Sequence, residues 1–270
     1  MENVKNDNQT PLCEVLVKTT YQTQITHPDD KNCENPIGYG SGFIVQYKNI
    51  SFFITADHVV HVDDYKLEDI RTGTDYVVSI FNNVRPETDK ISTVITPLGG
   101  FYYMERFNLI KPKENPELID VSLCLMKPIN FQYPFLTDKV CFGEVTVNMG
   151  EKKWSIPEEL LVDAKENTNY FVYGKIKPQM KGILLYREDT LKEELKYVGK
   201  SGDYYLLHTP EKIENYEEWA GLSGSPVISE TGECIGVLCS VTEGSNSIWV
   251  MPTDKIKMLM DIALMQENVK

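Results

Sequence analysis

The sequence predicts an all-β fold, a sandwich or a pair of barrels, that ends in one helix. Short apolar runs recur along the chain, and glycine, proline, asparagine and acidic residues separate them. After Pro252 the apolar residues Ile256, Leu259, Met260 and Ala263 follow helical spacing instead. The 270 residues are enough for one large β-rich domain or two fused small barrels.

The expected strands form two sets on either side of a segment near 127–133 that contains proline and asparagine. The first set comprises 42–46, 51–55, 76–81, 91–95 and 121–126. The second set comprises 140–147, 170–175, 183–186, 204–208, 226–229, 234–241 and 247–251. A further strand is expected near 15–17, and the poorly patterned segments 148–168 and 187–203 are expected to be insertions or short helices that shape the substrate cleft.

The composition argues against several classes of function. A net charge of −13 disfavours a nucleic-acid partner, because binding phosphates requires clustered Lys and Arg. No apolar run reaches membrane-spanning length, and the polar start 1–8 lacks the basic and apolar parts of a secretory signal. The six cysteines form no Cys-x-x-Cys pair. We therefore expect a cytoplasmic protein with reduced cysteines, no metal and no organic cofactor.

Three motifs carry the candidate chemistry. Gly-Leu-Ser-Gly-Ser-Pro at 221–226 presents Ser223 on a glycine-flanked turn, where two amides can point at one oxyanion. Thr-Ala-Asp-His at 55–58 places His58 just past an apolar strand, and Asp120 opens an alternating strand. The order His, Asp, Ser is that of chymotrypsin-type proteases and differs from the orders of α/β-hydrolases and subtilisins.

Together with Gly-Ser-Gly-Phe at 40–43 and Glu-Cys-Ile-Gly-Val-Leu at 233–238, these motifs resemble the trypsin/chymotrypsin-fold serine peptidases. The resemblance is closest to their bacterial trypsin-like and Do-type (HtrA-type) branch, without a PDZ domain, and covers about residues 36–265. It implies two six-stranded Greek-key β-barrels with the site between them, followed by a C-terminal helix. The implied division is an N-terminal arm 1–35, a first barrel 36–130, a second barrel 131–253 and a helix 254–270.

The resemblance also implies a role for each matched residue. His58 takes the proton of Ser223 as general base, Asp120 orients the imidazole, and the amides of Gly221 and Ser223 hold the oxyanion. Leu222 stands where secreted trypsins carry an aspartate that pairs with a newly cut N-terminus. Activation by that route is therefore not expected, and the oxyanion loop depends either on the packing of Leu222 or on an activating protein partner.

Five further residues are expected to bind substrate. Glu217 and Glu218 lie six and five residues before the nucleophile, about where the base of the primary specificity pocket lies in the family. A buried carboxylate there favours Lys or Arg before the cut, whereas a solvated acidic loop carries no such preference. Cys239, Ser240 and Val241 are expected to line the same pocket, and Val241 narrows it where many relatives carry glycine.

Other interpretations of these residues stay open. Ser225 competes with Ser223 by proximity, and His58-x-x-His61 with the acidic pair at 63–64 is a metal cluster that lacks a third ligand pattern. We expect an intracellular serine endopeptidase that makes limited or regulated cuts in protein or peptide substrates. A catalytically weak or inactive protease-fold binding or sensor module is the alternative, and an esterase would use the same triad.

Overall fold

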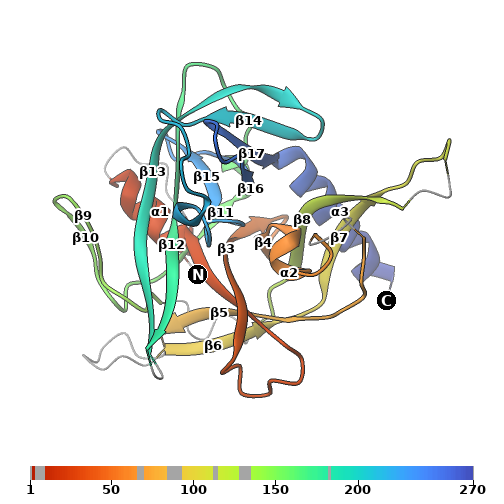
Figure 1. Cartoon of the computed structure of the whole chain (residues 1–270), viewed down its shortest axis with the longest axis horizontal. Coiled ribbons are helices and arrows are strands. Elements are labelled where there is room, and N and C mark those ends of the chain that lie inside the picture. Colours follow the sequence, from red (N-terminus) through yellow and green to blue (C-terminus); the bar gives the residue numbers. More distant parts are fainter. Residues whose placement is uncertain are drawn as a thin grey trace.

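The computed structural model describes residues 2–3, 10–65, 70–83, 93–111, 115–127, 135–181 and 184–269. Each half of the chain builds its own curved β-structure, and the C-terminal helix α3 (Thr253–Val269) contacts strands of both (Figure 1). None of the helices in these ranges is both long and apolar enough to span a membrane.

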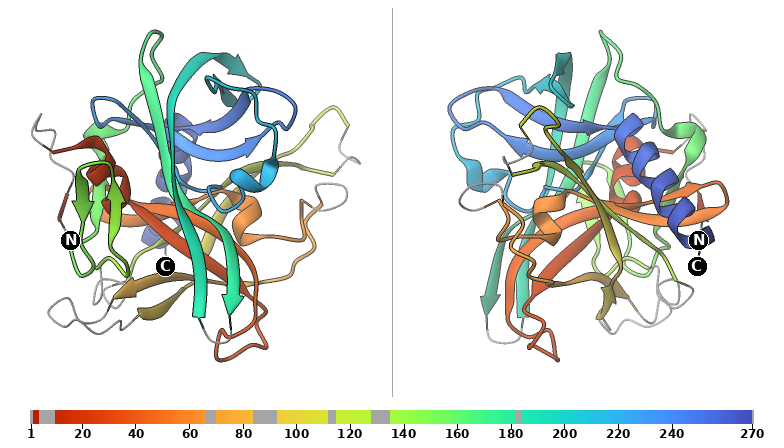
Figure 2. Two further views of the ribbon diagram at one scale, coloured as in Figure 1. Left: turned by 60° about the vertical axis from the view of Figure 1, so that its left-hand side comes forward. Right: turned by 90° about the vertical axis from the view of Figure 1, so that its right-hand side faces the viewer.

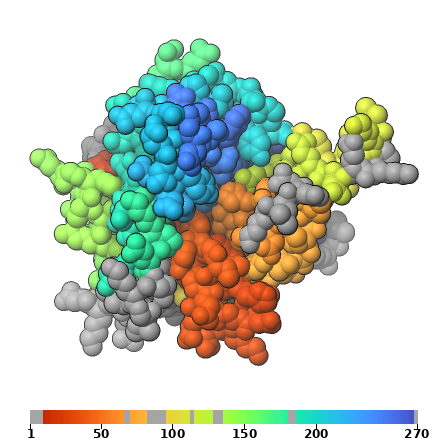
Figure 3. All heavy atoms as spheres, viewed as in Figure 1, coloured from red at the N-terminus to blue at the C-terminus, as the bar shows by residue number. Residues whose placement is uncertain are grey.

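The first half is an open sheet in the order β6-β5-β2-β3-β4-β8-β7, to which β11 adds in parallel beside β3. The bounds are β1 Glu2–Asn3, α1 Leu12–Thr19, β2 Thr20–Thr26, β3 Pro36–Tyr47, β4 Ile50–Thr55, α2 Asp57–Val60, β5 Val77–Asn83, β6 Thr93–Leu98, β7 Phe101–Arg106, β8 Glu117–Leu125 and β11 Trp154–Pro157. The β7–β8 hairpin projects from the body of the molecule (Figure 3).

The second half is a closed barrel in the order β12-β13-β14-β17-β16-β15. Its strands are β12 Asn169–Lys181, β13 Leu184–Ser201, β14 Tyr204–His208, β15 Pro226–Ser229, β16 Cys234–Val241 and β17 Ser247–Pro252. The 3-10 turns η2 (Glu158–Leu160) and η3 (Tyr216–Glu218) flank it, and β9 (Val140–Phe142) with β10 (Val145–Val147) forms a separate hairpin. The long hairpin β12–β13 reaches past its barrel to lie against β2 of the first half (Figure 2).

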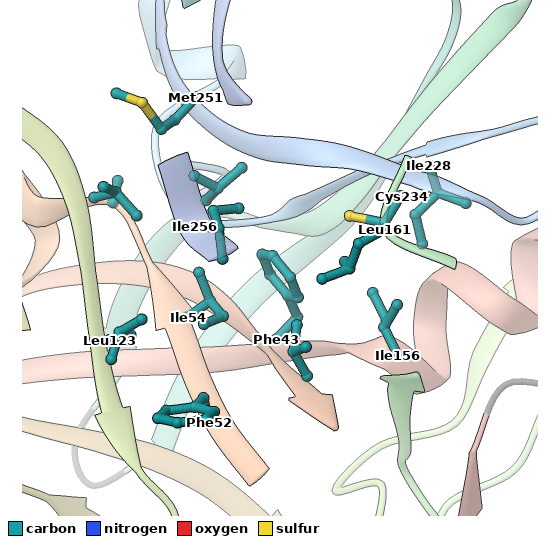
Figure 4. Close-up of a cluster of buried hydrophobic side chains, with 14 of the residues drawn as sticks. Phe43, Phe52, Ile54, Leu123, Ile156, Leu161, Ile228, Cys234, Met251 and Ile256 are labelled. Atoms are coloured by element: carbon teal, nitrogen blue, oxygen red, sulfur yellow. The ribbon is translucent and has the colours of Figure 1, made fainter. Parts of the chain in front are cut away.

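One apolar cluster joins the two halves. Phe43, Ile54 and Leu123 of the first half meet Ile228 of the second half and Ile256 of α3 in a core from which water is excluded (Figure 4). Burial of such side chains contributes about 1.5–3 kcal/mol each to the free energy of unfolding. The core therefore fixes the two β-structures against each other, so that a site between them has defined geometry.

The predicted all-β double-barrel class with a C-terminal helix is confirmed, although the first half is a seven-strand path in which no ring closes within the described residues. The strand expected near 15–17 is wrong: these residues lie in α1, whose buried face is continuous with the core. The predicted arm 1–35 holds β2, an interior strand of the first sheet. The segment 187–203 is not an insertion but most of β13, whose polar residues face solvent on a twisted hairpin.

Candidate active site

A cavity of about 890 Å³ lies between the two halves, and the sequence-predicted triad faces it from both sides. His58 and Asp120 come from the first half, and Ser223 comes from the second. Cys239, Ser240 and Val241 of β16 line it as expected, and aromatic side chains that the motifs did not indicate complete its walls. These are Tyr65, Tyr204, Tyr216 and Trp219.

His58 and Asp120 are held together by three hydrogen bonds. Residue 55, at the end of β4, pairs with residue 122 of β8, which brings the turn α2 beside Asp120. The backbone N–H of His58 donates to Asp120 Oδ1 at 3.0 Å, and the ring Nδ1 lies 3.0 and 2.9 Å from Oδ1 and Oδ2. This contact assigns the proton to Nδ1 and leaves Nε2 as the free base toward the cavity.

The charge of Asp120 makes His58 a stronger base. Burial lowers the pKa of His58, but the hydrogen-bonded Asp120 carboxylate and the nearby Asp57 carboxylate outweigh burial, so the pKa lies above its ordinary value. A base with a raised pKa accepts a hydroxyl proton more readily, and the resulting imidazolium is stabilised by the same carboxylate.

A second carboxylate, that of Asp57, stands behind the first. It is fully buried and accepts bonds from Ser122 Oγ at 2.5 Å, Arg71 Nη1 at 2.6 Å and Tyr65 Oη at 2.8 Å, while His61 Nδ1 lies 2.8 Å away. Burial raises the pKa of Asp57, but His61, Arg71 and Ser122 lower it by more than burial raises it. The pKa therefore lies below its ordinary value, and the carboxylate stays ionised. The network holds Tyr65 edge-on to the His58 ring, with ring centroids 5.9 Å apart.

Only the position of Asp57 inside the histidine motif could have signalled this network. Ser122 lies in the Asp-Val-Ser-Leu motif at 120–123, but nothing in the sequence pairs it with Asp57, and Arg71 belongs to no motif. His61, one candidate for a metal ligand, is instead bound to Asp57, and no group of three metal-ligating side chains occurs within the described ranges.

The nucleophile turn is shaped by backbone contacts. Gly221 and Gly224 have φ angles of 107° and 89°, which side chains rarely adopt. A Cβ on Gly224 would overlap the carbonyl oxygen of Ser41, so only glycine fits there. Ser41 ties the turn to β3, because its N–H donates to the Ser223 carbonyl at 2.8 Å and its Oγ donates to the Gly221 carbonyl at 2.8 Å.

The two predicted oxyanion amides are free. Within the described residues, the N–H groups of Gly221 and Ser223 have no hydrogen-bond acceptor, whereas the intervening Leu222 N–H donates to Trp219 at 3.0 Å. The Leu222 side chain is fully buried in the core of the second barrel and packs against Gly174 of β12. Apolar packing therefore occupies the place of the missing ion pair.

Ser223 Oγ donates to the Cys239 carbonyl at 3.3 Å, and no hydrogen bond joins it to His58 in this part of the chain. A change of the Ser223 side-chain rotamer redirects the hydroxyl, and catalytic contacts are often long before substrate binds. The competitor Ser225 is buried and donates to the Tyr173 carbonyl at 3.0 Å, outside the cavity walls.

Glu217 and Glu218 lie elsewhere than expected. Both are exposed on the 3-10 turn η3, and neither lines the cavity. The turn directs them outward because Trp219 fills the inward position, where it is 6% exposed and packs into the second barrel. No carboxylate from this segment therefore lines the cavity.

Comparison with protein-family models gives no match, and comparison with curated protein sequences gives none either. Solved structures do match. The scabies mite inactivated protease paralogue S-D1 superposes with a TM-score of 0.50 at 13% identity, with 93% of each chain covered.

Two bacterial structures are also similar. The MamO protease domain of Magnetospirillum magneticum gives a TM-score of 0.45 at 12% identity over 91% of this chain and 97% of that one. The active form of a protease from M. tuberculosis gives 0.43 at 13% identity over 97% and 87%. The chain has the trypsin/chymotrypsin fold of serine proteases.

Proposed function

We propose that this protein is a serine endopeptidase that hydrolyses peptide bonds through an acyl-enzyme. The observation that carries the proposal is one arrangement: the hydrogen-bonded His58–Asp120 pair and Ser223 face a single cavity, with two amides beside the serine that have no acceptor among the described residues. Nucleophile, base, orienting carboxylate and oxyanion donors are the parts that acyl transfer requires.

The proposed reaction begins when Ser223 Oγ turns from Cys239 toward Nε2 of His58 and attacks the scissile carbonyl. Its proton moves to Nε2, and the N–H groups of Gly221 and Ser223 hold the negative oxygen of the tetrahedral intermediate. His58 then protonates the leaving amine, so that the C–N bond breaks and the acyl group stays on Ser223. Water, deprotonated by His58, releases the acid and restores the hydroxyl.

The lining of the cavity favours an uncharged residue before the cut. Trp219, Leu238 and Val241 lie near Ser223 in its walls, and the two glutamates of η3 are outside. The Glu117 carboxylate also lines the cavity, but it is exposed and pairs with Arg106 at 3.0 Å. A Lys or Arg side chain entering the apolar wall would therefore lose hydration without gaining a free carboxylate partner. We therefore expect the protein to prefer an apolar residue before the cut, in place of the Lys or Arg that a buried Glu217 or Glu218 would have favoured.

Limited, regulated cleavage inside the cell belongs to the same proposal. The β7–β8 hairpin supplies Pro116 and Leu118 to the cavity wall, and its exposed end carries Phe107, Leu109 and Ile110. A wall that projects beyond the reacting centre adds contacts that few protein substrates satisfy, which limits the number of cuts.

A second candidate is a protease-fold binding module without activity. The Ser223 hydroxyl points to Cys239 and not to His58, and the matching scabies mite protein is described as inactivated. In that case the cavity binds a peptide segment and leaves it intact.

A library of fluorogenic peptides that vary the residue before the cut distinguishes these functions. We expect hydrolysis by the parent protein, greatest for apolar residues, and about a millionfold loss in Ser223→Ala. Ser225→Ala is the matched control, since it removes the neighbouring hydroxyl outside the cavity. Binding without hydrolysis by the parent would favour the module, and cleavage of casein at many sites would contradict limited proteolysis.

A further inference from the structure

A second, small cavity lies where β2 and β12 meet, away from the cleft that holds the triad. It has a volume of about 20 Å³, which is room for one water or one small ion. The charged residues in its lining are Lys153, Lys175 and Asp138, and Thr20, Gln22 and Tyr173 add polar groups. None of these residues has a role in the proposed reaction.

Lys153 is held deep in this cavity wall. It is 5% exposed, and its ammonium donates to the carbonyls of Val17, at 2.9 Å, and Thr20. The same ammonium lies 4.7 Å from the centre of the Tyr21 ring. These contacts orient the group but bring no negative charge to it.

The surrounding ionic groups carry more positive than negative charge. Lys175 Nζ pairs with Asp138 at 3.3 Å and Asp189 at 3.0 Å, and the Tyr173 hydroxyl also donates to Asp189. Arg187 interacts electrostatically with the same two carboxylates and stacks on Phe81 in the cavity wall. Three cations thus share two carboxylates, in a protein whose net charge is −13.

Three buried donors of this region have no hydrogen-bond partner within the described residues: Gln22 Nε2, Thr20 Oγ1 and Arg187 Nη1. Gln22 and Thr20 line the cavity and are only 8% and 1% exposed. A buried donor without an acceptor destabilises the folded state, and such groups are rare in proteins. Because two of the three, Gln22 and Thr20, line the same cavity, they indicate an acceptor inside it.

The acceptor is better satisfied by an anion than by water. Two ammonium groups face the cavity, and burial, followed by the charge of Lys175, lowers the pKa of Lys153 to about 7. Water would satisfy the donors but would supply no negative charge to Lys153, and the Asp138 and Asp189 carboxylates are already paired with Lys175. A negative ion beside Lys153 satisfies the donors and keeps this buried ammonium protonated.

The cavity also touches the backbone that carries the oxyanion loop. A Cβ on Gly221 would lie 2.5 Å from the carbonyl oxygen of Lys175, and the Tyr173 carbonyl accepts the bond from Ser225 Oγ. On the other wall, Gln22 pairs across the sheet with Ser41, which binds the carbonyls of 221 and 223. On one wall, Lys175 and Tyr173 contact the loop through their own carbonyls. On the other wall, Gln22 reaches the loop through its cross-strand partner Ser41.

We propose that this cavity binds one small monovalent inorganic anion, of halide size, and that its occupancy orders the oxyanion loop from behind. The second part of the proposal rests on the proposed peptidase function, whereas the binding of the anion does not. The anion then supports from behind a loop that an N-terminal ammonium–aspartate pair stabilises in secreted trypsins.

Binding is tested with bromide as the probe. The thermal midpoint is measured while sodium bromide replaces sodium gluconate at constant ionic strength, and crystals in bromide are examined for anomalous scattering. We expect a saturable rise in the parent and in Lys165→Met, which removes an exposed lysine that pairs with Glu233 and does not line the cavity. Lys153→Met and Gln22→Leu should lose the rise. No saturable rise in the parent, or no bromide peak between Lys153 and Gln22, would overturn the site.

Coupling is tested by the rate at which a fluorophosphonate labels Ser223. We expect saturating bromide to raise this rate about tenfold in the parent, with the same half-saturation as the thermal shift, and to leave Lys153→Met unchanged. Saturable binding with an unchanged labelling rate would overturn the coupling alone. Saturable binding with no labelling in either salt would overturn the peptidase proposal and leave the anion site standing.

Discussion

The two sides of the cleft hold their reacting groups by different physical means. His58 and Asp120 are fixed by charged hydrogen bonds, with the buried Asp57 network behind them. Ser223 is fixed by backbone contacts, left-handed glycines and the burial of Leu222. The geometry of the first side therefore depends on the protonation states of its histidine and carboxylate groups. The geometry of the second side depends on close packing that leaves no room for larger side chains. This difference predicts which substitutions damage each side.

The largest effect should come from Asp57→Ala on the charged side. Removal of the carboxylate leaves the Arg71 guanidinium buried without one of its partners, which we expect to lower the free energy of unfolding by about 3–5 kcal/mol. The measurement is urea denaturation. Asp261→Ala is the matched control, because this aspartate pairs with Lys48 on the surface and should cost less than about 1 kcal/mol. Equal losses would show that the network is not structural.

A smaller loss should follow Gly224→Ala on the backbone side. The new methyl group would overlap the Ser41 carbonyl and force a left-handed alanine, at a cost of about 2–4 kcal/mol. Gly232→Ala has nearly the same φ, 85°, but nothing within 4 Å of the new Cβ, and should cost only about 1 kcal/mol. If both variants lost the same stability, the close approach of the two backbones would not be what selects glycine.

The smallest effect should be a pH shift. Labelling of Ser223 requires neutral His58, so the rate should rise with pH through a midpoint above 6.5, the ordinary value for histidine. Asp57→Asn removes one of the negative charges that raise this pKa, so the midpoint should fall by less than about one pH unit. Asp261→Asn should not move it. A midpoint below 6.5 in the parent would contradict the assigned electrostatics.

Much of the site could be predicted from the sequence because its parts are local. Each reacting residue lies at the end of a strand or in a tight turn, and such positions leave a readable pattern: glycines at 221 and 224, and an apolar run before His58. Strands β15 and β16 of the second barrel could be predicted equally well, because both are short and continuous in apolar character.

What the sequence did not indicate depends on distant contacts. Asp57 is buried because Arg71 and Ser122 reach it from other segments, and no spacing encodes that meeting. Strand β13 is mostly polar because it lies on a projecting hairpin. The alternation of apolar and polar residues that marks a strand is therefore not visible in its sequence. Glu217 and Glu218 were expected near the pocket, but Trp219 takes the inward position of that turn.

The central claim is that Ser223, His58 and the free amides form a working nucleophilic site. The most direct measurement is the intact mass of the protein after treatment with a fluorophosphonate, beside Ser223→Ala and His58→Ala variants whose folding is verified by circular dichroism. We predict one adduct on the parent, none on Ser223→Ala and greatly slowed labelling of His58→Ala. An adduct on Ser223→Ala, or none on the folded parent in either bromide or gluconate, would contradict the claim.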